Sequence, residues 1–80
     1  MAKILIVDDE AQIRNMLSQV LTREGHEVVV AEDGNAGAKL FRRQSADLII
    51  TDLTMPGKDG LEMIGDLKKE FPDLKVIAIS

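Results

Sequence analysis

Four short apolar runs divide the chain, and the stretches between them follow a different hydrophobic period. The runs cover residues 4–7, 28–31, 48–52 and 75–79. Continuous apolar runs rich in β-branched side chains are typical of strands that are buried on both faces, as in a parallel sheet. The pattern therefore predicts four strands of a parallel sheet, with Asp52 at the carboxyl end of the third.

The stretches between the strands have the 3.6-residue period of amphipathic helices. The first helix is expected over residues 11–24 and ends at Gly25, which suits the left-handed position after a helix. Asn35 is expected to cap a second helix that ends near Arg43. A third helix is expected over residues 61–70, before Pro72. The predicted inward positions are Ile13, Met16, Leu17, Val20, Leu21, Ala36, Leu40, Phe41, Leu61, Ile64, Leu67 and Phe71.

The alternation reads βαβαβαβ, which indicates an α/β fold with helices flanking a parallel sheet. A strand is the final element, so residues 76–79 are expected at or near an open sheet edge, which natural proteins usually shield. We therefore expect either that the 80 residues are a truncated piece of a larger domain or that a second copy covers the edge.

Acidic residues follow two of the predicted strands. Asp8 and Asp9 come directly after the first strand, and Asp52 closes the buried third strand before the turn residues Met55, Pro56 and Gly57. The carboxyl ends of the strands are where open α/β sheets bind their ligands. Asp52 is therefore a candidate active-site residue.

If those two strands are neighbours, three carboxylates crowd one pocket, and their repulsion requires a cation. A hard divalent ion with oxygen ligands fits, and Mg²⁺ fits best. An aspartate beside such an ion can attack phosphorus and hold an aspartyl phosphate, and Ser80 could donate its hydroxyl to the phosphoryl group. The alternative for residues 8–10 is an acidic run that caps the following helix.

Composition narrows the class of protein. With 45% hydrophobic and 30% charged residues the chain is globular, and 80 residues make one small domain. The net charge of −4 argues against binding to nucleic acid or to an anionic membrane. The absence of cysteine excludes disulfides and zinc-thiolate sites. No signal peptide or spanning stretch is visible, so a cytoplasmic location is expected.

The chain resembles the receiver domain of bacterial two-component response regulators. The matching motifs are ILIVDDE at 4–10, AEDG at 31–34, DLIITDLTMPGKDG at 47–60 and VIAIS at 76–80, and together they cover nearly the whole chain. The resemblance implies a flavodoxin-like sheet with strand order 2-1-3-4-5, of which four strands and three helices are present here.

The resemblance also implies roles for particular residues. Asp52 would be the phosphoacceptor, which receives a phosphoryl group from the histidine of a sensor kinase. Asp8, Asp9, Asp52 and the backbone carbonyl of Thr54 would hold Mg²⁺, with Asp9 the more direct of the first two. Ser80 would be the switch hydroxyl. Such a domain is not a dedicated enzyme, although it catalyses its own phosphorylation and dephosphorylation.

The chain departs from the family in its last part. The family's lysine on a fifth strand, which pairs with the phosphoryl group, has no counterpart, and Lys58 is only the nearest lysine in sequence. The fourth helix, fifth strand and fifth helix, which form the usual signalling surface, are also missing. We expect weak Mg²⁺ binding and loss of signalling output.

The sequence leaves three alternative functions. A half-fold that self-associates, through the last strand or an uncovered sheet face, would act as a homo-oligomer without signalling. An aspartate-nucleophile phosphohydrolase needs a second acid two residues after the first, where this chain has Thr54. A flavin or nucleotide site is disfavoured because the acids at 8–10 would repel phosphate.

Overall fold

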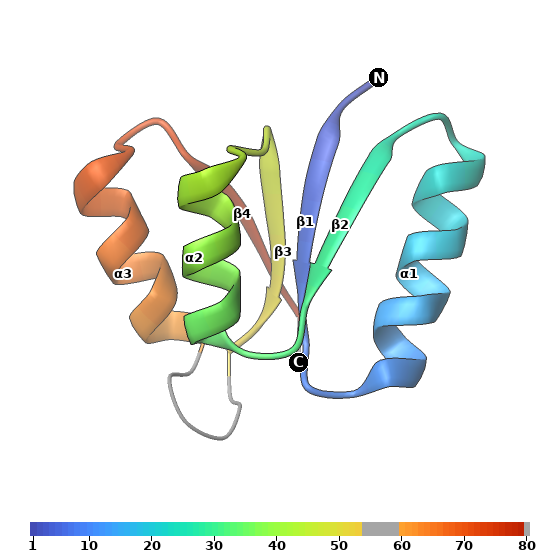
Figure 1. Cartoon of the computed structure of the whole chain (residues 1–80), viewed down its shortest axis with the longest axis horizontal. Helices are drawn as coiled ribbons and strands as arrows, with labels where there is room; N and C mark the ends of the chain where they lie inside the picture. The colour runs from blue at the N-terminus through green and yellow to red at the C-terminus, as the bar shows by residue number, and fades with distance from the viewer. Residues whose placement is uncertain (54–59, 80) are drawn as a thin grey trace.

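The computed structural model describes residues 1–53 and 60–79 as one sheet with helices on both faces (Figure 1). In chain order the elements are β1 (Lys3–Val7), α1 (Ala11–Arg23), β2 (Glu27–Ala31), α2 (Gly34–Arg43), β3 (Leu48–Asp52), α3 (Gly60–Glu70) and β4 (Lys75–Ile79). The predicted βαβαβαβ alternation is confirmed. None of the helices in the described part of the chain is long and apolar enough to cross a membrane.

The sheet has the strand order β2-β1-β3-β4, and every neighbouring pair is parallel. β1 and β3 lie side by side, with Val7 opposite Thr51. The expected placement of the acid-bearing strands as neighbours is therefore confirmed. β4 lies at an edge, which also agrees with the expectation from the sequence.

The two faces of the sheet are covered unequally. α2 and α3 lie on one face and α1 lies on the other (Figure 1). On the first face a buried cluster joins β1, α2, β3 and α3 through Leu5, Phe41, Ile49, Met63 and Leu67, among others. On the second face Ile4, Ile6 and Ile50 form a smaller cluster against α1. Since consecutive β3 side chains enter different clusters, β3 is buried on both faces, as its apolar run predicts.

α1 is less buried than its periodicity suggests. Leu17 and Leu21 pack against the smaller cluster, but Met16 is 55% exposed and Val20 is also exposed. The prediction that Met16 and Val20 face the core is wrong for this structure, because a single helix on this face presents only part of its apolar side to the sheet. The predicted end of the helix is confirmed, since Gly25 adopts φ 91° directly after the C-cap.

α2 begins earlier than the sequence reading suggested. The N-cap is Asp33, whose Oδ1 accepts a hydrogen bond from the amide of Ala36 at 2.8 Å, so the expected cap at Asn35 is wrong. An N-cap side chain satisfies an amide two or three residues ahead, and Asp33 reaches Ala36 in this way. The AEDG segment therefore both closes β2 and starts α2.

α3 buries Met63 and Leu67, whereas Leu61 is 65% exposed, which corrects its predicted inward position. Leu61 lies two residues before the buried Met63, and with 3.6 residues per turn the two side chains point to nearly opposite sides of the helix. The C-terminal ends of α2 and α3 are joined by a bidentate contact between Arg42 and Glu70. This hydrogen bond raises the pKa of Arg42 above its ordinary value, so its guanidinium stays charged.

Two helical glycines provide a matched test of this packing. A Cβ at Gly37 would lie 2.9 Å from Sδ of Met63 and 2.9 Å from Cγ2 of the buried Val7, whereas a Cβ at Gly65 would meet nothing within 4 Å. We predict that Gly65→Ala raises the free energy of unfolding by about 0.5–1 kcal/mol through helix propensity. Gly37→Ala should lower the free energy of unfolding. Crowding in a packed core costs about 1–3 kcal/mol, which outweighs the gain in helix propensity.

Urea unfolding of both variants measures the difference directly. Equal stabilisation by the two substitutions would show that α2 does not approach β1 and α3 this closely.

Candidate functional site

The three acids selected from the sequence meet at one edge of the sheet. Asp8 follows β1, Asp52 ends β3, and the register places Val7 opposite Thr51. One carboxylate oxygen from each of Asp8, Asp9 and Asp52 lies within 4.8 Å of the others. The predicted cluster of carboxylates at the carboxyl ends of neighbouring strands is therefore present.

Asp8 is the most firmly held of the three. It is only 1% exposed, and its amide donates to the carbonyl of Ala31 on β2 at 3.1 Å. Its Oδ1 accepts from the amide of Glu10 at 2.8 Å, and its carbonyl accepts from Nη1 of Arg14 at 2.6 Å. The backbone and the side chain of Asp8 are thus fixed from β2 and from the start of α1.

The contacts of Asp8 agree with both interpretations of the acidic run at residues 8–10, as a helix cap and as a metal site. Glu10 is the N-cap residue of α1 and makes no side-chain capping bond itself, whereas the side chain of Asp8 accepts the amide of Glu10. One oxygen of Asp8 therefore supports the entry into the helix, and the carboxylate still belongs to the acidic cluster. Capping and ligand binding are compatible in this residue.

Asp9 and Asp52 give the cluster access to water, because Asp9 is exposed and Asp52 is half-buried. Water access is necessary for a metal that keeps several water ligands, as Mg²⁺ does.

The donor set fits a hard divalent cation. All three side chains offer carboxylate oxygens, with no nitrogen or sulfur ligand among them. The three carboxylate oxygens lie within 4.8 Å of one another, so one ion could be shared among them.

Gly60 is a site-supporting residue that the sequence reading did not single out. It is buried at the start of α3, and a Cβ there would collide with the carbonyl oxygen of Asp52 and lie 2.7 Å from Oγ1 of Thr51. Thr51 is fully buried, and its hydroxyl donates to the same Asp52 carbonyl at 2.9 Å. The close approach of α3 to the end of β3 therefore depends on a glycine.

Arg14 is the second residue of this kind, because its guanidinium reaches back to the carbonyl of Asp8. In the sequence, Arg14 is one of several polar positions on the outer side of an amphipathic helix. Only its position in the first turn, next to the acidic run, distinguishes it. Other residues named from the sequence lie outside the described residues: Thr54, Lys58, Ser80 and the turn residues Met55, Pro56 and Gly57.

The protein is an α/β protein with a four-stranded parallel sheet, and an acidic cluster lies at the carboxyl edge of that sheet. Comparison with known proteins identifies its family. The family model "Response regulator receiver domain" matches residues 4–80. The chain belongs to this family.

Among curated relatives, the chain is 42% identical over 79 residues to the DNA-binding transcriptional regulator NtrC of Azospirillum brasilense. It is 37% identical, also over 79 residues, to the transcriptional regulatory protein GlrR of Escherichia coli K12. These matches cover 99% of this chain but only 16% and 18% of the relatives. The chain thus corresponds to one part of much longer proteins.

Among solved structures, the response regulator TrrA of Thermotoga maritima in complex with Mg²⁺-BeF matches with a TM-score of 0.93 and 44% identity. That match covers 98% of this chain and 68% of the TrrA chain. A second TrrA structure, in complex with the histidine kinase ThkA, matches with a TM-score of 0.90 over 98% of this chain and 67% of the other. The receiver fold is therefore shared with proteins of known structure.

The contact between Gly60 and Asp52 leads to a prediction about the site. Gly60→Ala should lower the free energy of unfolding by about 1–3 kcal/mol, since the obstacle to the new Cβ is backbone and cannot rotate away. It should also shift the amide resonances of Thr51 and Asp52 more than those of β2. Gly65→Ala, in the same helix, is the matched control. If Gly60→Ala left both stability and the Asp52 resonances unchanged, α3 would not pack against the end of β3.

Proposed function

We propose that Asp52 accepts a phosphoryl group from a phosphohistidine of a sensor kinase, with Mg²⁺ held by Asp8, Asp9 and Asp52. The observation that carries this proposal is the approach of three carboxylates to within 4.8 Å at the carboxyl edge of the sheet. The relative TrrA gives further support, because its structures include complexes with Mg²⁺-BeF and with the histidine kinase ThkA.

The position of each of Asp8, Asp9 and Asp52 determines its proposed role in phosphoryl transfer. Asp52 ends β3 and is half-buried, so one carboxylate oxygen can attack phosphorus while the bond from phosphorus to the kinase histidine breaks. Asp8, held by Glu10, Arg14 and Ala31, provides a firmly positioned carboxylate near Asp52. Asp9 is exposed and completes the cation-binding side. When bound, Mg²⁺ would offset most of the negative charge of the three carboxylates and would stabilise charge on the transferring phosphoryl oxygens.

Two further roles belong to the proposal by family resemblance. The backbone carbonyl of Thr54 would add a ligand to the cation, and the hydroxyl of Ser80 would contact the phosphoryl group after transfer.

The direct test is intact mass spectrometry after incubation with Mg²⁺ and acetyl phosphate. We predict that the chain gains the mass of one phosphoryl group and that Asp52→Asn gains none, because the amide is not a nucleophile. Chelating the cation should abolish the adduct in the parent chain. Asp73→Asn, the same substitution at the other end of the sheet, is the control and should be phosphorylated as the parent chain is.

An adduct that persists in Asp52→Asn would place the acceptor elsewhere. Absence of an adduct from a folded sample would show that these residues do not form a working acceptor without the family's lysine.

We also propose that the chain self-associates through the uncovered part of the sheet. Ile79 packs with the cluster on the α1 face, so Ile77, two residues earlier on β4, points to the same face, and it is 49% exposed. Among the described elements α1 is the only helix on that face, and its Met16 and Val20 side chains are exposed. Exposed apolar side chains on an edge strand favour pairing with a second copy.

Sedimentation at increasing concentration tests this second proposal. We expect the average mass to rise above that of a monomer and to return towards it in Ile77→Asp, which places a charge in the apolar surface. Leu61→Asp removes a more exposed apolar side chain from α3 and should leave the association unchanged. A concentration-independent monomer would contradict the proposal.

A further inference from the structure

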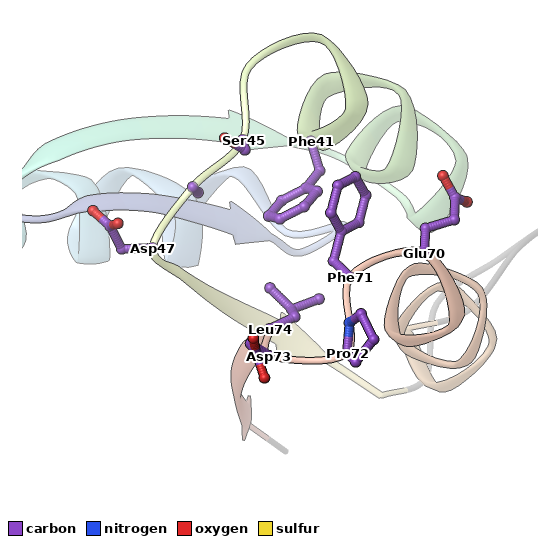
Figure 2. Close-up of a pocket in the computed structure, with 9 residues that line it drawn as sticks. Phe41, Ser45, Asp47, Glu70, Phe71, Pro72, Asp73 and Leu74 are labelled. Carbon is purple, nitrogen blue, oxygen red and sulfur yellow. The ribbon is translucent and has the colours of Figure 1, made fainter.

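A cavity of about 460 Å³ opens at the amino ends of β3 and β4, the edge of the sheet opposite to the acidic cluster. It lies between the C-terminal ends of α2 and α3 and the segments that lead into the two strands (Figure 2). We call it the amino-end groove. Asp8, Asp9 and Asp52 do not line the groove, so the proposed phosphoryl transfer does not explain it.

The floor of the groove is apolar. Phe41 and Leu74 are buried, while Phe71 is 36% exposed at the mouth. The rings of Phe41 and Phe71 lie edge to face, with centroids 5.0 Å apart and an interplanar angle of 71°. Figure 2 shows the two rings and Leu74 directed towards one another at the centre. An aromatic ring that stays accessible above a buried apolar floor can bind another apolar or cationic side chain.

The rim of the groove is acidic. Asp47, Glu70 and Asp73 line it, and none of the described lining residues is a lysine or an arginine. Glu70 already pairs with Arg42, and Oδ2 of Asp47 accepts only an uncharged backbone amide, that of Lys3, at 2.8 Å. Asp73 is exposed. The amine of Lys3 is bound to Oε1 of Gln44 at 2.8 Å and lies 3.9 Å from Glu27, so it is directed to other partners.

The apolar floor and the acidic rim of the groove together disfavour most classes of ligand. Nucleic acids and anionic membranes are repelled by Asp47 and Asp73, which have no cationic partner among the described residues. In Figure 2 Asp47 and Glu70 lie on opposite sides of the rings, so one small cation could not reach all of the rim. A peptide segment with alternating apolar and cationic side chains could place an apolar side chain on Phe71 and cationic side chains at Asp47 and Asp73.

We propose that the amino-end groove binds a basic, apolar segment of a partner protein. An aliphatic side chain of that segment packs on Phe71 and Leu74, and arginines pair with Asp73 and Asp47. Arginine suits this site better than lysine, because its planar guanidinium can stack on the ring of Phe71 while it donates to a carboxylate.

The test is a titration of the ¹⁵N-labelled chain with a blocked hexapeptide of alternating arginine and leucine. We expect the largest amide shifts at Phe71, Asp73 and Leu74, and we expect these shifts to diminish as salt is added. Asp73→Asn should weaken binding by about two- to fivefold, the range expected for one exposed ion pair. Phe71→Ala should weaken it further, whereas Glu24→Gln, an equal change of charge at the end of α1, should have no effect at the groove.

A second hexapeptide of alternating glutamate and leucine separates charge from apolar contact. If it shifts the same amides equally, the acidic rim has no role and the proposal is overturned. Arginine-peptide shifts confined to Asp8, Asp9 and Asp52 would overturn it as well, because they would place all of the attraction at the other edge. Asp73 is exposed, so Asp73→Asn decides the question even if Phe71→Ala does not fold.

Discussion

Repulsion among three carboxylates at the end of a buried sheet is the constraint on which this structure depends. The apolar strands β1 and β3 lie side by side, and a parallel arrangement brings Asp8 and Asp52 to the same edge. With Asp9, their oxygens come within 4.8 Å of one another. Like charges this close disfavour the folded state unless a cation or hydrogen-bond donors compensate. The protein supplies some donors itself, through the amide of Glu10 and the guanidinium of Arg14 near Asp8. The remaining negative charge favours a divalent cation at this edge, in agreement with the proposed Mg²⁺ site.

The surrounding structure can be understood as support for this edge. Gly60 lets α3 approach the carbonyl of Asp52, and Gly37 lets α2 approach Val7, the residue before Asp8. Both helices lie on one face, while α1 alone covers the other. The unequal cover leaves Ile77 exposed on the less protected face. The opposite edge carries the amino-end groove, so the two proposed binding functions are separated by the length of the strands.

The sequence predicted the strands well because their signal is local. Apolar runs that stop at acids mark both the element and its end, and β4 was predicted with the observed bounds. Helix faces were less predictable. The periodicity of α1 includes Met16, and that of α3 includes Leu61, but exposure depends on which neighbours cover each turn, and this is a property of the whole fold. The same limit applies to the site. Asp8, Asp9 and Asp52 could be found from their positions at strand ends, whereas Arg14 and Gly60 act through contacts that only the folded chain reveals.

We propose that one divalent cation binds between the ends of β1 and β3. Mn²⁺ uses the same kind of oxygen ligands as Mg²⁺ and broadens the resonances of nearby nuclei, so substoichiometric Mn²⁺ can locate the site in the ¹⁵N-labelled chain. We expect selective broadening of the amides of Asp9, Glu10 and Leu53, reversed by excess Mg²⁺, with Gly25 and Lys75 unaffected. Broadening centred on other acids, such as Glu62 and Asp66 of α3, or spread evenly over the surface, would contradict it.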